Sequence, residues 1–169
     1  MQYHDSLSTG LDSVALLGVH IPIKPTKEEL AAGTSYNRVS ELIYLAIKQV
    51  YVDLGDRKIM DLFHLPQLTD RTCFAILTML SKVIPAAFFI DVDLALLLCA
   101  KIICISMSHG NCTFSCLAYL AFGWLERRYH STYELSYEWG MLGHQLCESY
   151  SQIKPIAERS QCWEVFGTI

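Results

Sequence analysis

Three side chains that could together bind a metal ion lie close to one another in the sequence: His109, Cys112 and Cys116. In a helix the two cysteines would share one face, because residues four apart lie one above the other, and His109 would lie about one turn earlier. Thiolate and imidazole groups are the usual ligands of zinc. The cysteines, however, stand in an apolar stretch, where a free cysteine usually packs as a small hydrophobic side chain. We therefore favour packing and keep a metal site as the weaker alternative.

Two other groups of polar side chains could take part in catalysis or ligand binding. Asp91 and Asp93 could act as an acid and a base, but their place just before an apolar run is more typical of helix capping. An aromatic groove could bind a ligand, because Tyr and His combine an apolar body with a polar tip. For these residues we favour packing between helices. They are Tyr129, His130, Tyr133, Tyr137 and His144.

The common short catalytic motifs do not occur in the sequence. The phosphate-binding loop G-x-x-x-x-G-K-[ST], the glycine-rich loop, H-R-D and D-F-G stretches of protein kinases, and the nucleophile elbow G-x-S-x-G are all absent. We therefore expect no catalytic residue, no cofactor and no enzymatic activity in this chain. The alternative function is a cysteine and histidine sensor of redox state or metal, built on the three residues named first.

The composition indicates a protein with a large apolar core. Hydrophobic residues make up 52% and charged residues 18% of the 169 residues, against about 45–50% and about 25% in typical soluble domains. This length fits one domain, or a piece of a larger protein that covers its apolar flanks. The net charge of −4 disfavours nucleic acid as a partner, because phosphate binding needs clustered Lys and Arg.

Several features favour a cytoplasmic protein. The seven cysteines are an odd number and lie in apolar runs, so a reducing compartment is expected. The first residues lack the basic region and apolar core of a signal peptide. The strongest membrane candidate is a run of 14 residues, 94–107, which contains Lys101, whereas a spanning helix needs about 20 apolar residues. We expect a buried core helix there and no membrane insertion.

Helix signals recur along the chain and strand signals do not, which predicts an all-α fold. Thr26 and Glu29 form a capping box, residues 31–37 indicate a break, and a helix restarts at Ser40. The positions of this helix that recur with a helical period are Val39, Leu42, Ile43, Ala46 and Val50.

Residues 54–70 predict a corner between two long helices. Gly55 can adopt the left-handed conformation that ends a helix at low cost, and Asp56 can cap a short helix that follows it. Pro66 ends this short helix, because the residue before a proline avoids the helical region. The chain would then turn into the next long helix.

The helix after the corner begins at Thr69 or Asp70, and Pro85 is expected to close it. Its apolar face is expected to comprise Cys73, Ile76, Leu77, Leu80, Val83 and Ile84. The next helix opens at Asp91 or Asp93 and is capped by Gly110.

Two helices joined by a tight turn follow, over residues 111–127 and 131–150, the second opened by a capping box at Ser131 and Glu134. Their expected apolar faces comprise Phe114, Leu117, Ala118, Ala121, Phe122 and Leu125 in the first, and Leu135, Trp139, Leu142 and Leu146 in the second. Small residues that would allow close approach are Ala118, Gly123, Gly140 and Gly143.

These elements predict helical hairpins packed as a segment of a tetratricopeptide-like (TPR-like) α-solenoid. No clean repeat of 34 residues occurs, so a single irregular helical domain fits the pattern equally well. In the solenoid interpretation residues 1–24 end a preceding repeat, residues 25–90 form a helix pair with the corner at 54–70, and residues 91–169 form helical hairpins.

Three stretches of the chain carry a resemblance to a known family: LLGVHIPIKPTKEEL, LGDRKIMDLFHLPQLTD and HGNCTFSCLAYLAFG. They are similar to the helical region of very large bacterial signalling proteins. Those proteins combine a serine/threonine kinase, a P-loop signal-transduction ATPase, a long helical repeat region, a GAF domain and a histidine kinase. The matching residues that we take as its structural signature are Gly18, Pro22, Gly55, Arg57, Asp61, Pro66, Asp70, Gly110, Asn111, Tyr119 and Gly123.

The resemblance implies a non-catalytic interaction and regulatory module that couples ATPase and kinase domains, with proteins as its partners. The chain would be a fragment or remnant of such a kinase. A last helix is predicted from Lys154, and its apolar residues would form an uncovered face, which predicts self-association. These residues are Trp163, Val165, Phe166 and Ile169.

Overall fold

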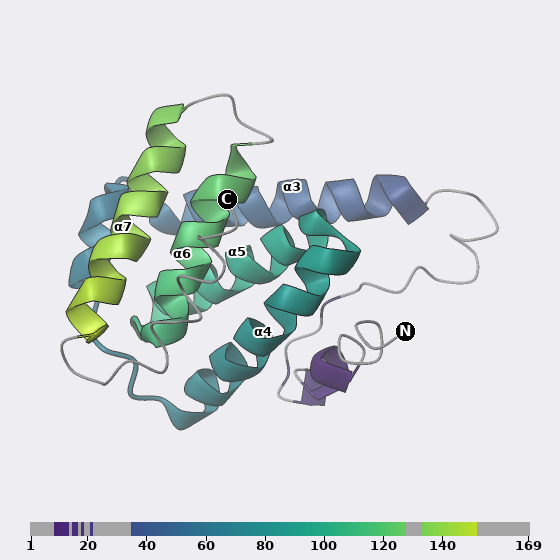
Figure 1. Cartoon of the computed structure of the whole chain (residues 1–169), viewed down its shortest axis with the longest axis horizontal. Helices are drawn as coiled ribbons and strands as arrows, with labels where there is room; N and C mark the ends of the chain where they lie inside the picture. The colour runs from purple at the N-terminus through teal and green to yellow at the C-terminus, as the bar shows by residue number, and fades with distance from the viewer. Residues whose placement is uncertain are drawn as a thin grey trace.

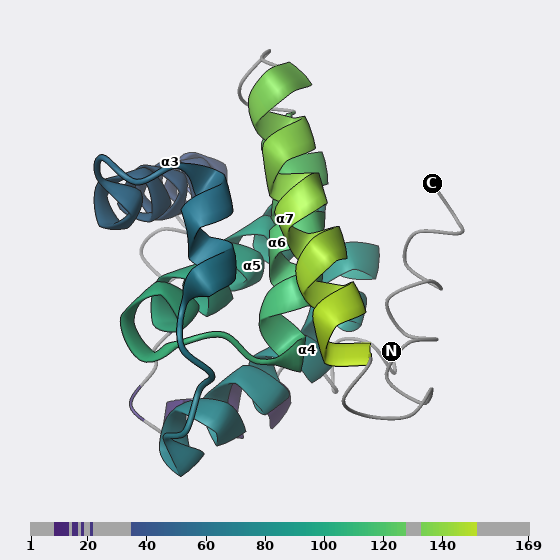
Figure 2. The same ribbon diagram turned by 90° about the vertical axis from the view of Figure 1, so that its left-hand side faces the viewer.

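The computed structural model describes residues 9–13, 15–16, 18, 21, 35–127 and 133–151. Within these residues the protein is all-α, as predicted. The elements are α3 (Ser35–Leu54), the 3-10 helix η1 (Ile59–His64), α4 (Arg71–Ile90), α5 (Val92–His109), α6 (Thr113–Glu126) and α7 (Tyr133–Ser151). α6 and α7 form an antiparallel hairpin, and α5 packs against α3, α4 and α6 (Figure 1 and Figure 2).

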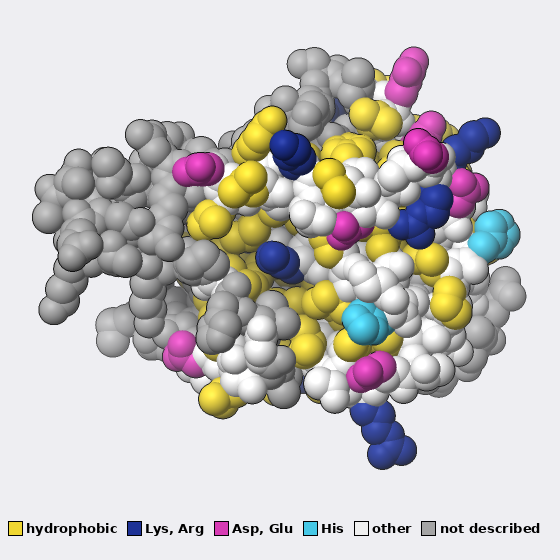
Figure 3. Space-filling model, turned by 180° about the vertical axis from the view of Figure 1, so that it is seen from behind, with side chains coloured by type: hydrophobic (Ala, Val, Ile, Leu, Met, Phe, Trp, Pro, Cys, Tyr) yellow, Lys and Arg dark blue, Asp and Glu magenta, His cyan; other side chains and the backbone are white. Residues whose placement is uncertain are grey.

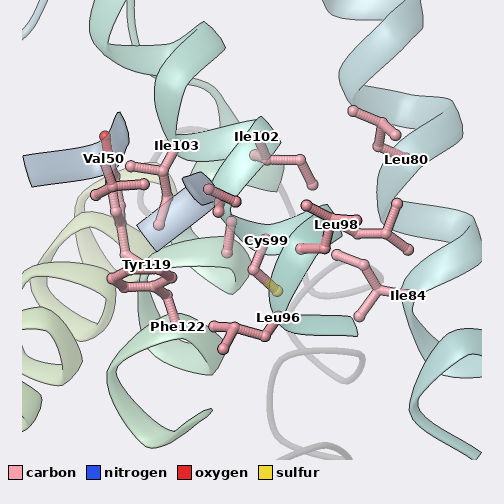
Figure 4. Close-up of a cluster of buried hydrophobic side chains, with 14 of the residues drawn as sticks. Val50, Leu80, Ile84, Leu96, Leu98, Cys99, Ile102, Ile103, Tyr119 and Phe122 are labelled. Atoms are coloured by element: carbon pink, nitrogen blue, oxygen red, sulfur yellow. The ribbon is translucent and has the colours of Figure 1, made fainter. Parts of the chain in front are cut away.

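α5 is the central helix of the core. Its residues 94–100 are all buried, because α3, α4 and α6 pack around it. A helix enclosed in this way is hydrophobic on all sides, as the sequence of α5 is. In Figure 4 the α5 side chains lie between Leu80 and Ile84 of α4 on one side and Val50 of α3 with Tyr119 of α6 on the other. The prediction of a buried core helix at this position is confirmed.

Two described helices, α4 and α5, are long and apolar enough to cross a membrane by length and composition alone. Within the fold, 44% of the apolar window of α4 and 61% of that of α5 are buried. Buried core helices of soluble proteins pass the same test, so the two helices are weak evidence for or against membrane insertion.

α3 begins earlier than the sequence indicated. It starts at Ser35 and runs through Asn37, so the predicted restart at Ser40 is wrong. A single Asn in a first turn is a weak helix breaker, and packing of the rest of the helix overrides its preference. Of the predicted apolar face, Ile43, Ala46 and Val50 are buried, whereas Leu42 is only half-buried.

The corner forms as predicted, with a different capping residue. Gly55 adopts a left-handed φ of 60° after α3. The short helix η1 follows Lys58, whose backbone amide donates to Asp61 Oδ2 at 2.8 Å. Asp56 lies before this turn and does not cap it, because the side chain that stabilises the turn comes from within η1 and bonds backward.

α4 is longer than predicted. Asp70 caps it by accepting hydrogen bonds from two backbone amides of the first turn, at 2.7 and 2.9 Å. The helix continues through Pro85 to Ile90, so the prediction that Pro85 closes it is wrong. Pro85 is exposed, whereas the two alanines after it are buried, and burial of that second half keeps the chain helical. The predicted apolar face is buried, with Cys73 at its partly exposed edge.

The buried residues of α6 differ in part from the predicted apolar face. Ala118 and Phe122 are buried as expected, but Cys116, Tyr119 and Leu120 are buried too. Phe114, Leu117 and Ala121, placed in the core by the sequence, are only half-buried. The reason is that α6 packs against α4, α5 and α7 together, which buries more of its circumference than a single-faced pattern suggests.

The α6–α7 hairpin is held close by glycines. A methyl group on Gly123 would lie 2.8 Å from Trp139 Cβ, and one on Gly143 would lie 2.8 Å from the Cys116 carbonyl oxygen. Gly140, which was expected to serve the same purpose, has open space around it. Trp139 and the leucines after it on α7 are buried as predicted. The predicted caps at Thr26 and Ser131, and the helix from Lys154, lie outside the described residues.

Candidate functional site

The three candidate metal ligands do not form a metal site. α5 ends at His109, which is exposed, whereas Cys112 and Cys116 are buried. Cys112 Sγ lies 3.6 Å from Ser115 Oγ, and Cys116 Sγ donates to the Cys112 carbonyl oxygen at 3.7 Å. Among the described residues no group of three His, Cys, Asp or Glu side chains could hold a metal ion.

The other cysteines of the core are protonated packing residues. Burial raises the pKa of Cys99 to about 12. Burial, and then a hydrogen bond to Asp53, raise the pKa of Cys104 to about 12. Because the thiolate is the reactive form, these thiols are chemically inert at neutral pH. All six cysteines of the described residues are free thiols.

Asp91 and Asp93 act in helix capping. Asp91 Oδ1 accepts a hydrogen bond from the Asp93 backbone amide at 2.9 Å and caps α5. The two carboxyl groups are therefore placed by the helix start, which agrees with the favoured interpretation.

The candidate Tyr and His residues near the start and middle of α7, Tyr133, Tyr137 and His144, face outward. Tyr133 and Tyr137 are exposed, and His144 Nδ1 lies 4.0 Å from Glu148 Oε2 on the same helix. The Arg127 guanidinium lies 5.7 Å from the Tyr133 ring centre. These residues therefore do not fill the space between α6 and α7, so packing between these helices is wrong for them. Tyr129 and His130 lie outside the described residues.

The polar site that the structure does build is centred on Asn111, in the turn between α5 and α6. Its backbone amide donates to the Pro66 carbonyl oxygen at 2.8 Å, and its own carbonyl accepts from the Leu68 amide at 2.8 Å. These two bonds form a short parallel bridge between the turn and the chain after η1. Residues about 45 apart in sequence are thereby joined backbone to backbone.

The Asn111 side chain adds two more bonds in a fully buried position. Its Nδ2 donates to the Leu62 carbonyl oxygen of η1 at 2.7 Å, and its Oδ1 accepts from the Tyr119 hydroxyl of α6 at 2.9 Å. The Tyr150 hydroxyl, near the end of α7, donates to the Asn111 carbonyl at 2.9 Å. The side chain is thus paired at both ends, as a buried amide requires.

We call the Asn111 hydrogen bonds to Leu62, Pro66, Leu68, Tyr119 and Tyr150 the Asn111 junction. Burial raises the pKa of Tyr150 to about 12 and raises the pKa of Tyr119 well above its ordinary value. Both hydroxyls therefore stay protonated and donate at neutral pH. The junction ties η1, the α5–α6 turn and both helices of the α6–α7 hairpin into one unit.

Gly110 is required for this junction. It has a left-handed φ of 107°, and a methyl group there would lie 2.4 Å from the Pro66 carbonyl oxygen. A side chain would therefore both strain the backbone and separate the two segments that the Asn111 junction joins. The predicted role of Gly110 as the C-cap of α5 is confirmed.

Arg57 secures the near side of the corner. Its guanidinium donates to the carbonyl oxygens of Leu54, at 3.1 Å, and Asp53 at the end of α3. It also contacts Met107 Sδ of α5 at 3.9 Å. A cation at a helix C-terminus satisfies orphan carbonyls and complements the helix dipole.

An apolar counterpart of the junction forms around Trp139 of α7. Its ring stacks on Tyr119 with ring centres 5.8 Å apart and meets Phe122 edge-on at 5.2 Å. Its Nε1 donates to the Tyr51 hydroxyl of α3 at 3.4 Å. Tyr119 thus belongs to both clusters, with its ring against Trp139 and its hydroxyl on Asn111.

The structure therefore assembles much of the signature that the sequence pointed to. Gly110 lies against Pro66, and Asn111 bonds to both Pro66 and Tyr119. Asp61 and Asp70 cap the helices on either side of Pro66. Gly18 has a φ of 86° but lies apart from the junction contacts, and Pro22 lies outside the described residues. Sequence reasoning missed Tyr150. The sequence signal for this site is Asn111 in apolar surroundings, because a buried Asn side chain needs hydrogen-bond partners.

No protein-family model, curated protein or solved structure matches the chain. The resemblance to the helical region of bacterial signalling kinases therefore stands on the sequence motifs alone.

Proposed function

We propose that this chain is a non-catalytic helical-repeat module, TPR-like in architecture, that couples ATPase and kinase domains in a multidomain serine/threonine–histidine signalling kinase. The observation that carries the proposal is the Asn111 junction. The residues that resemble the family come from separate stretches of sequence, yet they hold the corner against the α6–α7 hairpin. A signature of this kind serves geometry, because it fixes how successive helix pairs are set against one another.

A module of this kind transmits a change of state through rigid packed elements. The Asn111 junction supplies such a rigid element. Its five hydrogen bonds and the close approach of Gly110 to the Pro66 carbonyl oxygen restrict the corner to one arrangement. Coupling between distant sites is carried through packed side chains, hydrogen-bond networks and rigid helices. In this proposal a movement of α7 would act on the corner through Tyr150 and Tyr119.

The surface suits protein partners. Large hydrophobic side chains on α3 are exposed at Tyr44, Leu45 and Val52. Seen from behind, the molecule shows hydrophobic side chains interspersed with Lys, Arg, Asp and Glu (Figure 3). Exposed apolar side chains such as Tyr44 and Leu45 can supply the apolar centre of a protein–protein contact.

The test is to identify the polypeptide that carries this sequence in the cells that express it. An antibody raised against the chain is used to precipitate that polypeptide, whose mass and incorporation of labelled phosphate from ATP are measured. The proposal predicts a much longer polypeptide that autophosphorylates. A polypeptide of about this length without kinase activity would overturn it.

The role of the junction is tested in the same parent protein. Asn111→Ala is compared with Gln145→Ala, an exposed position on α7. Asn111→Ala should alter how nucleotide binding to the ATPase affects kinase activity, and Gln145→Ala should not. Equal behaviour of the two variants would contradict a coupling role.

A further inference from the structure

A stripe of apolar side chains along α6 stays partly open to solvent. Phe114, Leu117 and Ala121 are half-buried, and Trp124 is 38% exposed. These positions recur at spacings of three and four residues, so they lie on one side of the helix. The sequence placed the first three of them in the core, because no charged residue occurs in α6 before Glu126. The stripe therefore has the composition of a buried surface without the burial.

α4 adds an aromatic side chain at each end of this stripe. The ring centres of Phe74 and Phe114 lie 5.6 Å apart, and those of Phe88 and Trp124 lie 5.7 Å apart. The two helices therefore run side by side in the same direction (Figure 1). We call the α6 stripe together with Phe74 and Phe88 the α4–α6 face. A surface of this chemistry suits an apolar side of one further helix.

The described part of the chain ends beside this face. The Tyr150 hydroxyl donates to the Asn111 carbonyl oxygen at 2.9 Å, and Asn111 lies just before the start of α6. Ser151 is the last residue of α7, and 18 residues follow it. The chain therefore leaves α7 at the end of the α4–α6 face where Phe74 meets Phe114.

The length of the segment that follows matches the length of the face. Four residues are enough for a turn between two helices, and residues 156–169 then number 14, as many as α6 has. As helices, both would span about 21 Å. We propose that residues 156–169 form a helix that packs on the α4–α6 face of the same molecule, parallel to α6.

The register that follows from this path sets a large side chain against a small one. With Ile156 beside Phe114, Trp163 comes opposite Ala121, because each lies seven residues further along its helix. Phe166 is three residues beyond Trp163 and shares its side of the segment. Trp163 then fills the space over the smallest residue of the stripe, as packed helix surfaces require.

The tether favours this occupant over a second copy. A segment joined to α7 by a turn of four residues binds its own molecule at an effective concentration of about millimolar. The proposal covers, within one molecule, the apolar side chains from which the sequence suggested self-association. It does not rest on a kinase parent.

The test is limited proteolysis of the full chain with trypsin, which can cleave after Arg159 in the middle of the segment. Mass spectrometry follows the loss of residues 160–169. Because cleavage tracks the population of the open form, the full chain should be cleaved at least about tenfold more slowly than a free peptide of residues 152–169. This protection should be the same at every protein concentration.

The pairing of Ala121 with Trp163 is tested by exchanging the large and the small side chain. Ala121→Trp and Trp163→Ala should each raise the cleavage rate at Arg159 about tenfold, because the first crowds the contact and the second empties it. The double variant should return toward the wild-type rate.

The matched control combines Ala121→Trp with Val165→Ala, because Val165 lies on the other side of the proposed helix and its loss should not restore protection. Circular dichroism of each variant establishes that the fold is kept. Wild-type cleavage as fast as that of the free peptide would overturn the proposal, and so would a double variant cleaved as fast as Ala121→Trp. Protection that rises with protein concentration would overturn it in favour of a second copy.

Discussion

The Asn111 junction contrasts with the exposed apolar side chains of α4, which we call the α4 face: Phe74, Met79, Phe88 and Phe89. At the junction every polar group of one buried residue has a partner at 2.7 to 2.9 Å. On the α4 face large apolar side chains meet solvent. Buried hydrogen bonds are directional and specify one arrangement, whereas exposed apolar surface is not directional and favours association. The hydrogen bonds that set the shape of the protein therefore lie apart from its most exposed apolar side chain on α4, Phe89.

The largest loss of stability is expected for Gly110→Ala. The methyl group would have to displace the Pro66 carbonyl, 2.4 Å away, at a φ of 107°, so we expect the free energy of unfolding to fall by about 3 kcal/mol. The matched control is Gly55→Ala, where φ is 60° and the nearest atom lies at 3.9 Å. There only the backbone strain applies, and the loss should be about 1 kcal/mol. Chemical denaturation followed by circular dichroism measures both, and equal losses would contradict a close contact at the junction.

Asn111→Ala should lower the free energy of unfolding by about 2 kcal/mol, because the Leu62 carbonyl and the Tyr119 hydroxyl both lose their buried partner. Combining it with Tyr119→Phe should cost about 1 kcal/mol less than the sum of the two single losses. Strict additivity in this double-mutant cycle would show that the two side chains do not interact. Gln145→Ala, at an exposed site, should change stability by less than about 0.5 kcal/mol.

Tyr150 gives the junction a dependence on alkaline pH. Its pKa is raised by burial from an ordinary value of 10.0 to about 12, so the neutral hydroxyl is favoured by folding. Its contribution is complete below pH 10 and is lost as pH rises from about 10 to 12, where the unfolded chain binds fewer protons than the folded one. The buried Tyr119 acts in the same direction.

Tyr150→Phe should cost about 1 kcal/mol at neutral pH and should reduce the alkaline fall in stability. The control is Tyr137→Phe, because Tyr137 is exposed and should leave both unchanged. Urea titrations at neutral and alkaline pH measure the effect. An alkaline fall that is unchanged in Tyr150→Phe would exclude this hydroxyl as its source.

The smallest effect is expected on the α4 face. Phe89→Ser replaces a side chain that is 71% exposed, so the free energy of unfolding should change by less than about 0.5 kcal/mol. The same denaturation experiment measures it. A loss as large as that of Asn111→Ala would show that this face is buried in the folded chain, and the contrast with the junction would fail.

Local signals predicted much of the fold because they act within a few residues. Gly55 and Asp70 mark their helix ends correctly, and the apolar period of α4 gives its buried side. The errors lie where distant contacts decide. Pro85 does not end α4 because buried residues follow it, and the face of α6 is turned because three helices cover it.

The sequence predicted several residues of the Asn111 junction but not the hydrogen bonds that join them. The motifs marked Gly110, Asn111 and Tyr119, but pairing of Asn111 with the chain after η1 spans the length of two helices. No local pattern reports which segments meet at that distance. Tyr150 gave no signal for the same reason, since its only mark in the sequence is a place near a helix end.

The measurement that tests the central claim most directly is native-state hydrogen exchange at the amides of Leu68 and Asn111. These two amides bond across the junction, to Asn111 and Pro66. If the Asn111 junction is the rigid element of the fold, both amides exchange only through global unfolding, and their opening free energy equals that from denaturation. Rapid exchange of these amides while the α5 core stays protected would show that the corner opens on its own, and would contradict the account.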